Sequence, residues 1–596
     1  RGIAASRGSR HGMRSAGQPS RAVPRRAPLL YSTPVAEGTA ADRSVSALLA
    51  ASAVATVLAP LGIVTLLGAG NACLWLDEIT YFRLQDDIPL RAAEIGRPGA
   101  PAARWFSNFF YCDVQRLFQI PLVSLGLANP LRSPEALVRT LSLVAYAATL
   151  LVFLLVPRRR SGGLPVAVLG TLVFGGMPLI LFYAFEGRVY AAVSLVVVAL
   201  MVALEQAAAS GGGWRLALVA SLAILAGHLH LWTICLFAAF FLAGAADLLR
   251  RRQATPRSRA LFAASLPGLV VILGEFAAMK ATQPSDPPFA LFRRQPLQET
   301  LFQTVRSVFE GPLQVQHVFR EGRAPFLVAV GVLLLAVLVF KTATAAESTD
   351  AFGPRSMART ALLALGVSVA LAVGFGHFVH GRYQVPLHAA LLYATARGLA
   401  GRPSVLLAFL LVSTEVALLP STASAIQEKS NNATIAKLIL TRSDRSATAV
   451  VVQHGVVSGY PVPHHSIGLG FYLNDLSPGA PAIPILELPG LRPTNGDPGT
   501  YRYFNGGEAL LARTLAVPRD RFREWATSEA PARVWIVFPR WPVPASERQV
   551  AVLREVLIKE AGFAVGSQYL VAGYPEVAVE QLVKGSVRPS PRVPPS

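Results

Sequence analysis

The sequence predicts a mainly α-helical, polytopic membrane protein with a C-terminal α/β domain outside the membrane. First, 53% of the 596 residues are hydrophobic and only 15% are charged, with a mean hydropathy of +0.45. Soluble domains carry about 25% charged residues. Second, apolar runs almost free of charge recur along the chain, and third, the composition turns mixed and polar after Pro420.

The apolar runs are long enough to cross a bilayer, which takes about 20 residues. The run at 216–249 is too long for one helix, and we expect it to divide near Gly227–His230. About eleven spans follow from this count. The runs lie near 46–70, 136–156, 164–182, 189–207, 216–249, 260–279, 324–340, 360–376, 385–399 and 404–420.

The net charge of +21 would suggest nucleic acid in a soluble protein, but here the basic residues gather beside particular apolar runs. They cluster in the N-terminal tail, at Arg158–Arg160 and at Arg250–Arg252. Because cytoplasmic loops carry an excess of Lys and Arg, the tail and both clusters are expected inside. Eleven crossings then place Asp77, the turns at 186–190 and 376–383, and everything after about 421 outside.

Four regions are expected along the chain. Residues 1–43 form a basic, disordered cytoplasmic tail without the features of a cleavable signal. Residues 44–420 form the transmembrane domain, with a long outer loop at 71–134. Residues 421–585 form the extracytoplasmic domain, since β-like runs at 447–452 and 534–538 and a helix-like stretch at 545–561 indicate a small α/β fold. Residues 586–596 form a second disordered tail.

Asp77 and Glu78 follow the first apolar run directly. A carboxylate at a water-facing membrane rim can act as general base on an acceptor hydroxyl or hold a divalent metal. The alternative is an ordinary acid at a helix end that faces water. Metal dependence stays open at this point.

Two further outer turns carry isolated arginines. Glu186 and Arg188 lie between Tyr183 and Tyr190, and Arg382 precedes Tyr383 and follows His380. The planar fork of arginine suits phosphate oxygens. The alternatives are a local Glu186–Arg188 ion pair that closes the turn, and an Arg382 that reaches toward lipid phosphates.

His228, His230 and Trp232 mark the turn that divides the long apolar run. Neutral imidazoles can bind a metal or substrate hydroxyls. Their spacing does not place both histidines on one helix face, and no full set of metal ligands is visible, so a structural role is the alternative. Acids at one outer rim and arginines at two others together suit a cavity for an anionic lipid-linked substrate.

At these residues the chain resembles the polytopic C-type glycosyltransferases (GT-C), closest to the bacterial branch of protein mannosyltransferases and lipid A aminoarabinose transferases. The resemblance covers about 44–420 and rests on Leu76-Asp77-Glu78, on the Tyr183–Tyr190 turn and on Arg382-Tyr383-Gln384-Val385-Pro386. No second acidic pair like that of the oligosaccharyltransferases occurs in the spans, which argues against that branch.

The resemblance implies a polyprenyl-phosphate sugar donor that enters from the outer leaflet. Asp77 would be the catalytic base, with Glu78 beside it in an undetermined role. Residues that bind the donor phosphate would be Arg188, Arg382, Tyr190, Tyr383 and His380, and residues that bind substrate would be Glu186 and His230.

The predicted function is therefore an inverting membrane glycosyltransferase with Asp77 as general base. Its partners are the lipid bilayer, the lipid-linked donor and a glycan, lipid or protein acceptor, with no nucleic acid. No cofactor is certain, and a divalent metal is an open alternative. The composition fits a multi-pass protein of the bacterial inner membrane. The alternative functions are a lipid-linked glycan transporter or flippase, or a glycan polymerase or ligase.

Overall fold

The computed structural model divides the chain into two units, residues 1–51 and 52–596, and every described residue belongs to the second. The expected first span at 46–70, Asp77 and Glu78 lie outside the described residues. Within the second unit we describe a helical bundle and a C-terminal sheet domain, each by itself. The described residues are 107–126, 134–158, 163–282, 296–313, 323–345, 352–375, 381–399, 401–427, 430–453, 455–457, 460–462, 464–488, 491–493, 517–539, 544–571 and 576–585.

Long apolar helices confirm the predicted membrane-spanning fold class. In the described part of the chain, 7 helices are long and apolar enough to cross a membrane, or 8 if one bent pair counts as a span. Every predicted apolar run after the first is helical. The long helices are α6 (Pro134–Arg158), α9 (Tyr190–Ser210), α11 (Ile234–Arg251), α12 (Pro256–Thr282), α14 (Ala324–Thr344), α15 (Pro354–Phe375) and α17 (Arg402–Gln427).

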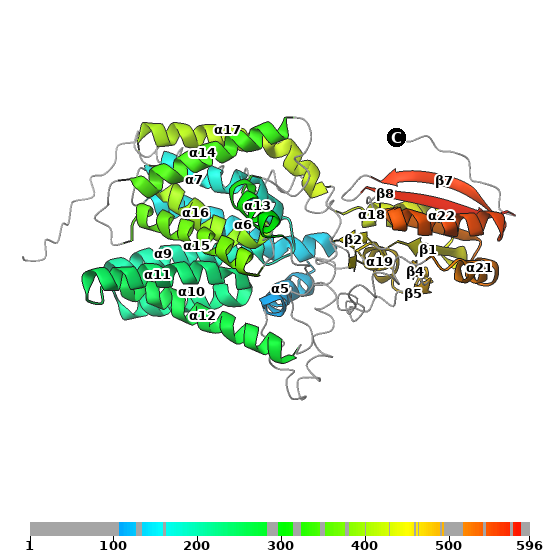
Figure 1. Cartoon of the computed structure of the whole chain (residues 1–596), viewed down its shortest axis with the longest axis horizontal. Coiled ribbons are helices and arrows are strands. Elements are labelled where there is room, and N and C mark those ends of the chain that lie inside the picture. The colour runs from blue at the N-terminus through cyan, green and yellow to red at the C-terminus, as the bar shows by residue number, and fades with distance from the viewer. Residues whose placement is uncertain are drawn as a thin grey trace, which may run out of the picture. The chain divides into compact units, whose positions relative to one another are not determined.

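Two apolar helices are shorter than a full span, α10 (Gly213–Leu229) and α16 (Val385–Arg397). All residues of α16 are buried. It packs against α7 (Gly163–Gly176), α9, α14 and α15. Figure 1 shows α16 among these helices. A helix enclosed by protein needs no lipid-facing length, so α16 can be short and still form the centre of the bundle.

The run predicted as one span at 164–182 is bent. It consists of α7 and α8 (Pro178–Ala184), which meet at 70°. Pro178 lacks the backbone N–H that would continue the helix. Gly176 lies so close to α17 that an added Cβ would overlap the carboxylate of Glu415. The bend directs the chain into the turn at 185–189.

Basic side chains concentrate at one end of the bundle, which is the end that the sequence predicts to be cytoplasmic. Arg257, at the start of α12, donates from Nη2 to Ser356 Oγ at the start of α15 over 2.6 Å. Since α12 and α15 start together, the 381–384 segment after α15 lies at the opposite end. The basic residues at these ends are Arg215, Arg250, Arg251, Arg252, Arg257, Arg259, Lys341, Arg355, Arg359, Arg397 and Arg402.

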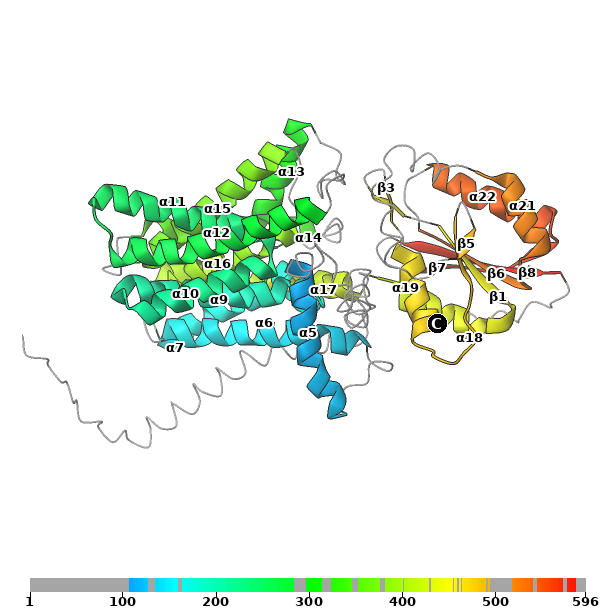
Figure 2. The same ribbon diagram turned by 90° about the horizontal axis from the view of Figure 1, so that it is seen from below.

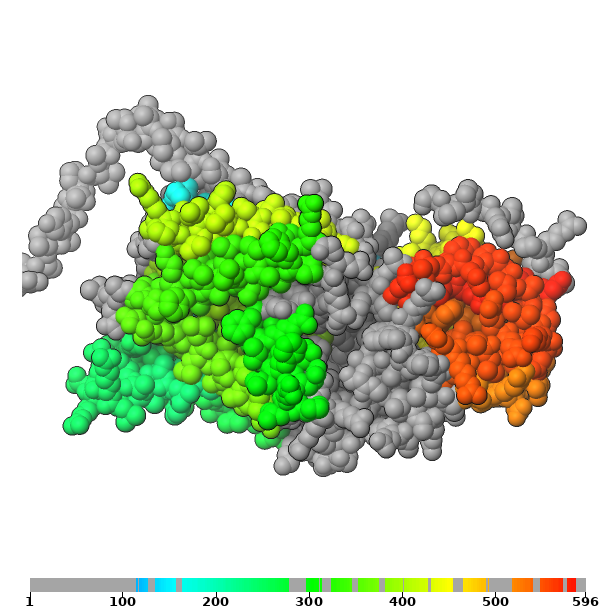
Figure 3. Space-filling view, turned by 45° about the horizontal axis from the view of Figure 1, so that its top comes forward, coloured from blue at the N-terminus to red at the C-terminus, as the bar shows by residue number. Residues whose placement is uncertain are grey.

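Two helices beside the bundle do not qualify as spans, α5 (Ser107–Ser124) and α13 (Leu297–Glu310). Apolar side chains of α13 are exposed, among them Leu301, Phe302 and Phe309. In Figure 3 the bright green spheres of this part of the chain lie at the surface of the molecule. An amphipathic helix of this kind suits the membrane interface.

The C-terminal domain is a mixed six-stranded sheet of order β5-β4-β1-β6-β8-β7. Strand β1 pairs in parallel with β4 and β6, whereas β8 pairs antiparallel with both β6 and β7. The β-like runs and the helix expected at 545–561 are therefore present. The strands are β1 (Thr448–Val452), β4 (Ile485–Glu487), β5 (Arg492–Pro493), β6 (Arg533–Pro539), β7 (Phe563–Val571) and β8 (Val577–Lys584), with β2 (Gly455–Val457) and β3 (Tyr460–Val462) as a separate hairpin.

Helices cover both faces of this sheet (Figure 2). Val450 and Trp535 pack on the face of α18 (Asn432–Arg442) and α19 (His464–Gly470). Their neighbours Val451 and Ile536 pack on the face of α21 (Arg519–Ser528) and α22 (Pro544–Lys559). This alternation is the two-residue period of a strand buried on both sides.

Candidate functional site

The turn at 185–189 holds Glu186 and Arg188 between α8 and α9. Gly187 packs so closely on α6 that an added Cβ would overlap Val138. Ser142, also on α6, donates from Oγ to the carbonyl of Arg188 over 3.1 Å. Glu186 and Arg188 are only 3% and 5% exposed, with 3.5 Å between Arg188 Nε and Glu186 Oε1. The turn is thus fixed to α6, and its two charges are almost out of solvent.

A short 3₁₀ segment, η3 (Gly381–Gln384), holds Arg382 and Tyr383 at the start of α16. Arg382 donates from Nη2 to Tyr383 Oη over 3.2 Å, and its Cζ lies 5.0 Å from the centre of the Tyr383 ring. A guanidinium over an aromatic face is stabilised by the ring quadrupole. The contact fixes the direction of Arg382 before any ligand binds.

A row of rings joins the two turns. Ring centres lie 4.5 Å apart for Tyr183 and Tyr190, 5.5 Å for Tyr190 and His230, and 6.0 Å for His230 and Tyr383. Arg188 is in turn hydrogen-bonded to Tyr190. Six predicted site residues therefore meet at one end of the bundle: Glu186, Arg188, Tyr190, His230, Arg382 and Tyr383.

The two guanidinium groups influence each other. Burial, together with the charge of Arg382, lowers the pKa of Arg188 to about 10. Both arginines stay charged at neutral pH, and Glu186 supplies one opposing charge, so these described residues leave a positive excess. Burying like charges is costly without a counter-ion, and a bound anion would relieve that cost.

Two neighbours of Arg382 are also shifted. Its charge lowers the pKa of the Tyr383 phenol. Burial, with a smaller effect of Arg382, lowers the pKa of His230 to about 4. His230 is therefore a neutral imidazole at physiological pH. Its Nδ1 accepts from the backbone N–H of Trp232 over 3.2 Å, so its Nε2–H can donate to a hydroxyl, and the ring adds no charge to the site.

Other predicted residues are not part of this cluster. Asp77, Glu78 and His380 lie outside the described residues. His228 Nδ1 lies 2.9 Å from Glu275 Oε1 on α12, whereas the His230 ring lies next to the Tyr190 ring. The two histidines therefore have different neighbours. Among the described residues, no group of three or more His, Cys, Asp and Glu side chains could hold a metal ion.

Three residues of the site had no role assigned from sequence. Tyr183 extends the ring row, Ser142 anchors the Arg188 turn, and Gln384 ends η3 with a fully buried side chain. Tyr183 lies within the Tyr183–Tyr190 motif and Gln384 within the Arg382–Pro386 motif, so the motifs themselves point to these two residues. Ser142 lies inside an apolar run, and nothing in the sequence pattern distinguishes it.

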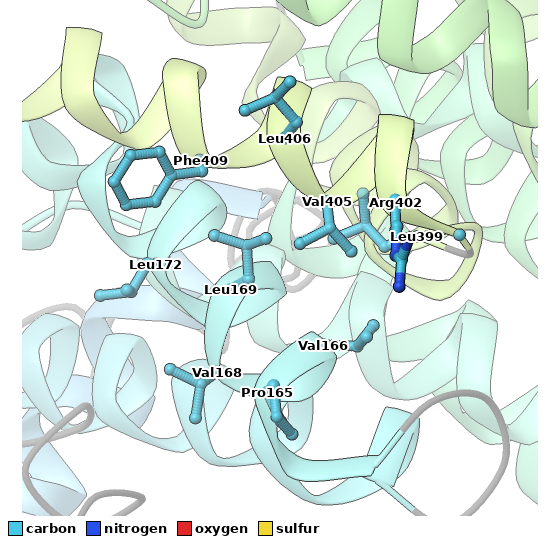
Figure 4. Close-up of a pocket in the computed structure, with 11 residues that line it drawn as sticks. Pro165, Val166, Val168, Leu169, Leu172, Leu399, Arg402, Val405, Leu406 and Phe409 are labelled. Atoms are coloured by element: carbon cyan, nitrogen blue, oxygen red, sulfur yellow. The ribbon is translucent and has the colours of Figure 1, made fainter.

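A separate groove of about 760 Å³ opens between α7 and α17 (Figure 4). Apolar side chains such as Leu169, Leu172 and Phe409 line it, and Arg402 is the only charged residue among those that line it. Arg402 starts α17 at the basic end of the bundle. The groove therefore lacks the groups for acid–base chemistry, and the arginine cluster remains the candidate site.

No protein-family model matches the chain, and no curated protein matches it. Among solved structures, the chain is similar to ArnT from Cupriavidus metallidurans in the apo state, with 13% identity over 91% of this chain and 98% of that chain and a TM-score of 0.38. It is also similar to the same protein bound to undecaprenyl phosphate, with 15% identity over 88% and 97% of the two chains and a TM-score of 0.38. At this TM-score the likeness decides nothing about the site.

Proposed function

We propose that this chain is a membrane glycosyltransferase that transfers a sugar from a polyprenyl-phosphate donor to an acceptor at the outer face of the membrane. The observation that supports it most is the meeting of Arg188 and Arg382, from distant parts of the chain, in one tyrosine-lined site. The sequence resemblance to GT-C enzymes supplies the class of donor.

A lipid phosphate fits this site better than a soluble anion does. Arg188 and Arg382 present planar forks that match phosphate oxygens. The Tyr190 and Tyr383 phenols add polar contacts next to both forks. The site lies at the end of an apolar bundle, so a phosphate held there leaves its hydrocarbon chain in the bilayer.

The proposed reaction is a direct displacement. Asp77 removes the proton from an acceptor hydroxyl or amine, whose oxygen or nitrogen attacks the anomeric carbon. The bond between that carbon and the phosphate oxygen breaks, and polyprenyl phosphate leaves with the bonding electrons. Arg188 and Arg382, with His380 nearby in sequence, stabilise the negative charge that develops. A single displacement inverts the anomeric centre and needs one carboxylate as base.

Glu186 and His230 are proposed to bind substrate, and Glu78 to assist Asp77. Glu186 is a buried acceptor beside Arg188, and His230 is a neutral group between Tyr190 and Tyr383. A divalent ion at Asp77 and Glu78 is an open alternative to direct base catalysis. Transfer assays with and without EDTA distinguish the two.

The substitution Asp77→Asn tests the base. We expect it to abolish transfer from polyprenyl-phosphate sugars, measured as release of polyprenyl phosphate, while the melting temperature stays unchanged. Asp520→Asn is the matched control, because Asp520 is an exposed side chain on α21. Transfer at the wild-type rate by Asp77→Asn would refute the assignment.

The alternatives make different predictions in the same preparation. A flippase would move the lipid across proteoliposomes without consuming the sugar bond. A polymerase or ligase would build or move chains of several sugars instead of adding one. We propose the bacterial inner membrane as the location, with the N-terminal tail inside and the C-terminal domain outside, because the basic ends of the bundle helices share one side.

A further inference from the structure

Polar groups without a partner gather where α13 meets the start of α16. Both amide atoms of Gln384, His388 Nδ1 and Ser307 Oγ are enclosed, and none has a hydrogen-bond partner in the described structure. Gln384 is fully buried and His388 is 1% exposed. Leaving a buried polar group without a hydrogen-bond partner is costly, so several such groups in one place point to a ligand that would satisfy them.

The packing places these groups in one region. Gln384 is the N-cap of α16, and His388 follows it by four positions, about one helical turn later. His388 Nε2 lies 3.1 Å from the carbonyl of Val308 on α13. A Cβ added at Gly381 would lie 3.5 Å from Ser307 Oγ, so α13 also lies against η3.

The hydrogen-bond capacities of the three groups differ. Since a carbonyl only accepts, Nε2 of His388 carries the proton and Nδ1 is left as an acceptor. The Gln384 amide offers donors and an acceptor, and the Ser307 hydroxyl offers both. Groups that each donate and accept once, such as sugar hydroxyls, match this set.

The region adjoins the proposed phosphate site. Gln384 follows Arg382 by two residues, and Arg382 Nε is also enclosed without a partner in the described structure. In a polyprenyl-phosphate sugar the anomeric carbon is bonded to the phosphate. A phosphate at Arg382 therefore brings the sugar ring within a few ångströms of η3 and the start of α16.

We propose that Gln384, with His388 and Ser307, binds hydroxyl groups of the donor sugar and so determines which sugar is accepted. This inference rests on the proposed function. A site built to hydrogen-bond a substrate hydroxyl discriminates strongly against an analogue that lacks it, because its own buried groups are then left unpaired.

Two probes separate the sugar from its carrier: undecaprenyl phosphate, and the undecaprenyl-phosphate sugar that the wild type consumes fastest among the mannosyl, glucosyl and aminoarabinosyl forms. We expect Gln384→Leu to weaken binding of the sugar-bearing lipid about 10-fold or more, and binding of undecaprenyl phosphate less than about 2-fold. Arg382→Gln should weaken binding of both. Gln206→Leu, at the other end of α9, is the matched control and should leave both unchanged.

Equal weakening of both probes by Gln384→Leu, or no weakening of either, would overturn the proposal. If Gln384→Leu does not fold, Ser307→Ala gives the same test with a smaller change, and it should weaken binding of the sugar-bearing lipid alone. Failure of the proposed function looks different, since the wild type would then bind neither lipid.

Discussion

Arg188 Nε lies 3.5 Å from Glu186 Oε1, with only 7% and 4% of the two side chains exposed. The pair offsets one of the two guanidinium charges in the site. Arg382 has no carboxylate partner within the described residues, and its contacts are with Tyr383. The two arginines are therefore not equivalent: among the described residues, Arg188 has a carboxylate beside it and Arg382 does not.

Removing the Arg382 charge should impair transfer without unfolding the protein. We expect Arg382→Gln to lower the transfer rate by about 10²–10³, the usual effect of losing one donor that stabilises developing charge. The melting temperature should change little, since no buried carboxylate in the described structure loses its partner. Initial rates with a polyprenyl-phosphate sugar and thermal unfolding in detergent measure the two effects.

Arg188→Gln and Glu186→Gln form the comparison for this experiment. If Arg188 only closes its turn by pairing with Glu186, both substitutions should lower stability together and affect the rate alike. If Arg188 binds phosphate, Arg188→Gln should lower the rate much more than Glu186→Gln does. If the transfer rate of every variant falls only in proportion to its loss of stability, neither arginine binds the phosphate.

The close contact of Gly187 with α6 predicts a sensitive position that carries no chemistry of its own. Gly187→Ala should push the turn away from Val138 and displace Arg188. A misplacement of about 1 Å can cost roughly 10² in rate. Gly366→Ala on α15 is the control, because its added Cβ meets nothing within 4 Å. A wild-type rate for Gly187→Ala would show that the exact position of the turn is unimportant.

His230 should make stability depend on pH. Its pKa is lowered to about 4 in the folded protein, against about 6.5 when unfolded, so the unfolded state binds more protons between these values. Stability should be constant above about pH 7 and fall as the pH drops toward 4, by about 2 kcal/mol between pH 7 and pH 5. His230→Gln cannot be protonated and should lose this part of the dependence, as measured by melting temperature against pH. Identical pH curves for the two proteins would contradict the burial of a neutral imidazole.

The sequence predicts the helices and strands better than their contacts. Hydropathy locates the apolar runs because lipid and a buried core both select apolar residues. It cannot distinguish a helix that faces lipid from one that is enclosed by protein. Hydropathy therefore locates α16 but does not predict that other helices enclose it. It also locates the run at 164–182 without its bend, although Pro178 is a signal for that bend. The β-like runs at 447–452 and 534–538 were predicted, but not their parallel pairing through β1.

The same limit applies to the site. Motif order suggested that Arg188 and Arg382 share an outer rim, but only the packing of α16 against α9 brings the two turns together. The Glu275 partner of His228 and the buried amide of Gln384 depend on helix rotation and tertiary contacts. Periodicity does not encode either. The roles of Asp77, Glu78 and His380 stay predictions.

The buried pair between Arg397 and Glu205 provides a stability test at the end of the bundle away from the site. Arg397 Nη2 lies 2.6 Å from Glu205 Oε1, with 2% and 4% of the side chains exposed, so α16 and α9 are joined by charges out of solvent. Arg397→Met should lower the free energy of unfolding by about 3–5 kcal/mol, because it leaves a buried carboxylate without its partner. The double variant Glu205→Met/Arg397→Met removes both charges and should regain most of that loss. If thermal unfolding shows the double variant to be no more stable than Arg397→Met, the buried charge of Glu205 is not the cause of the loss.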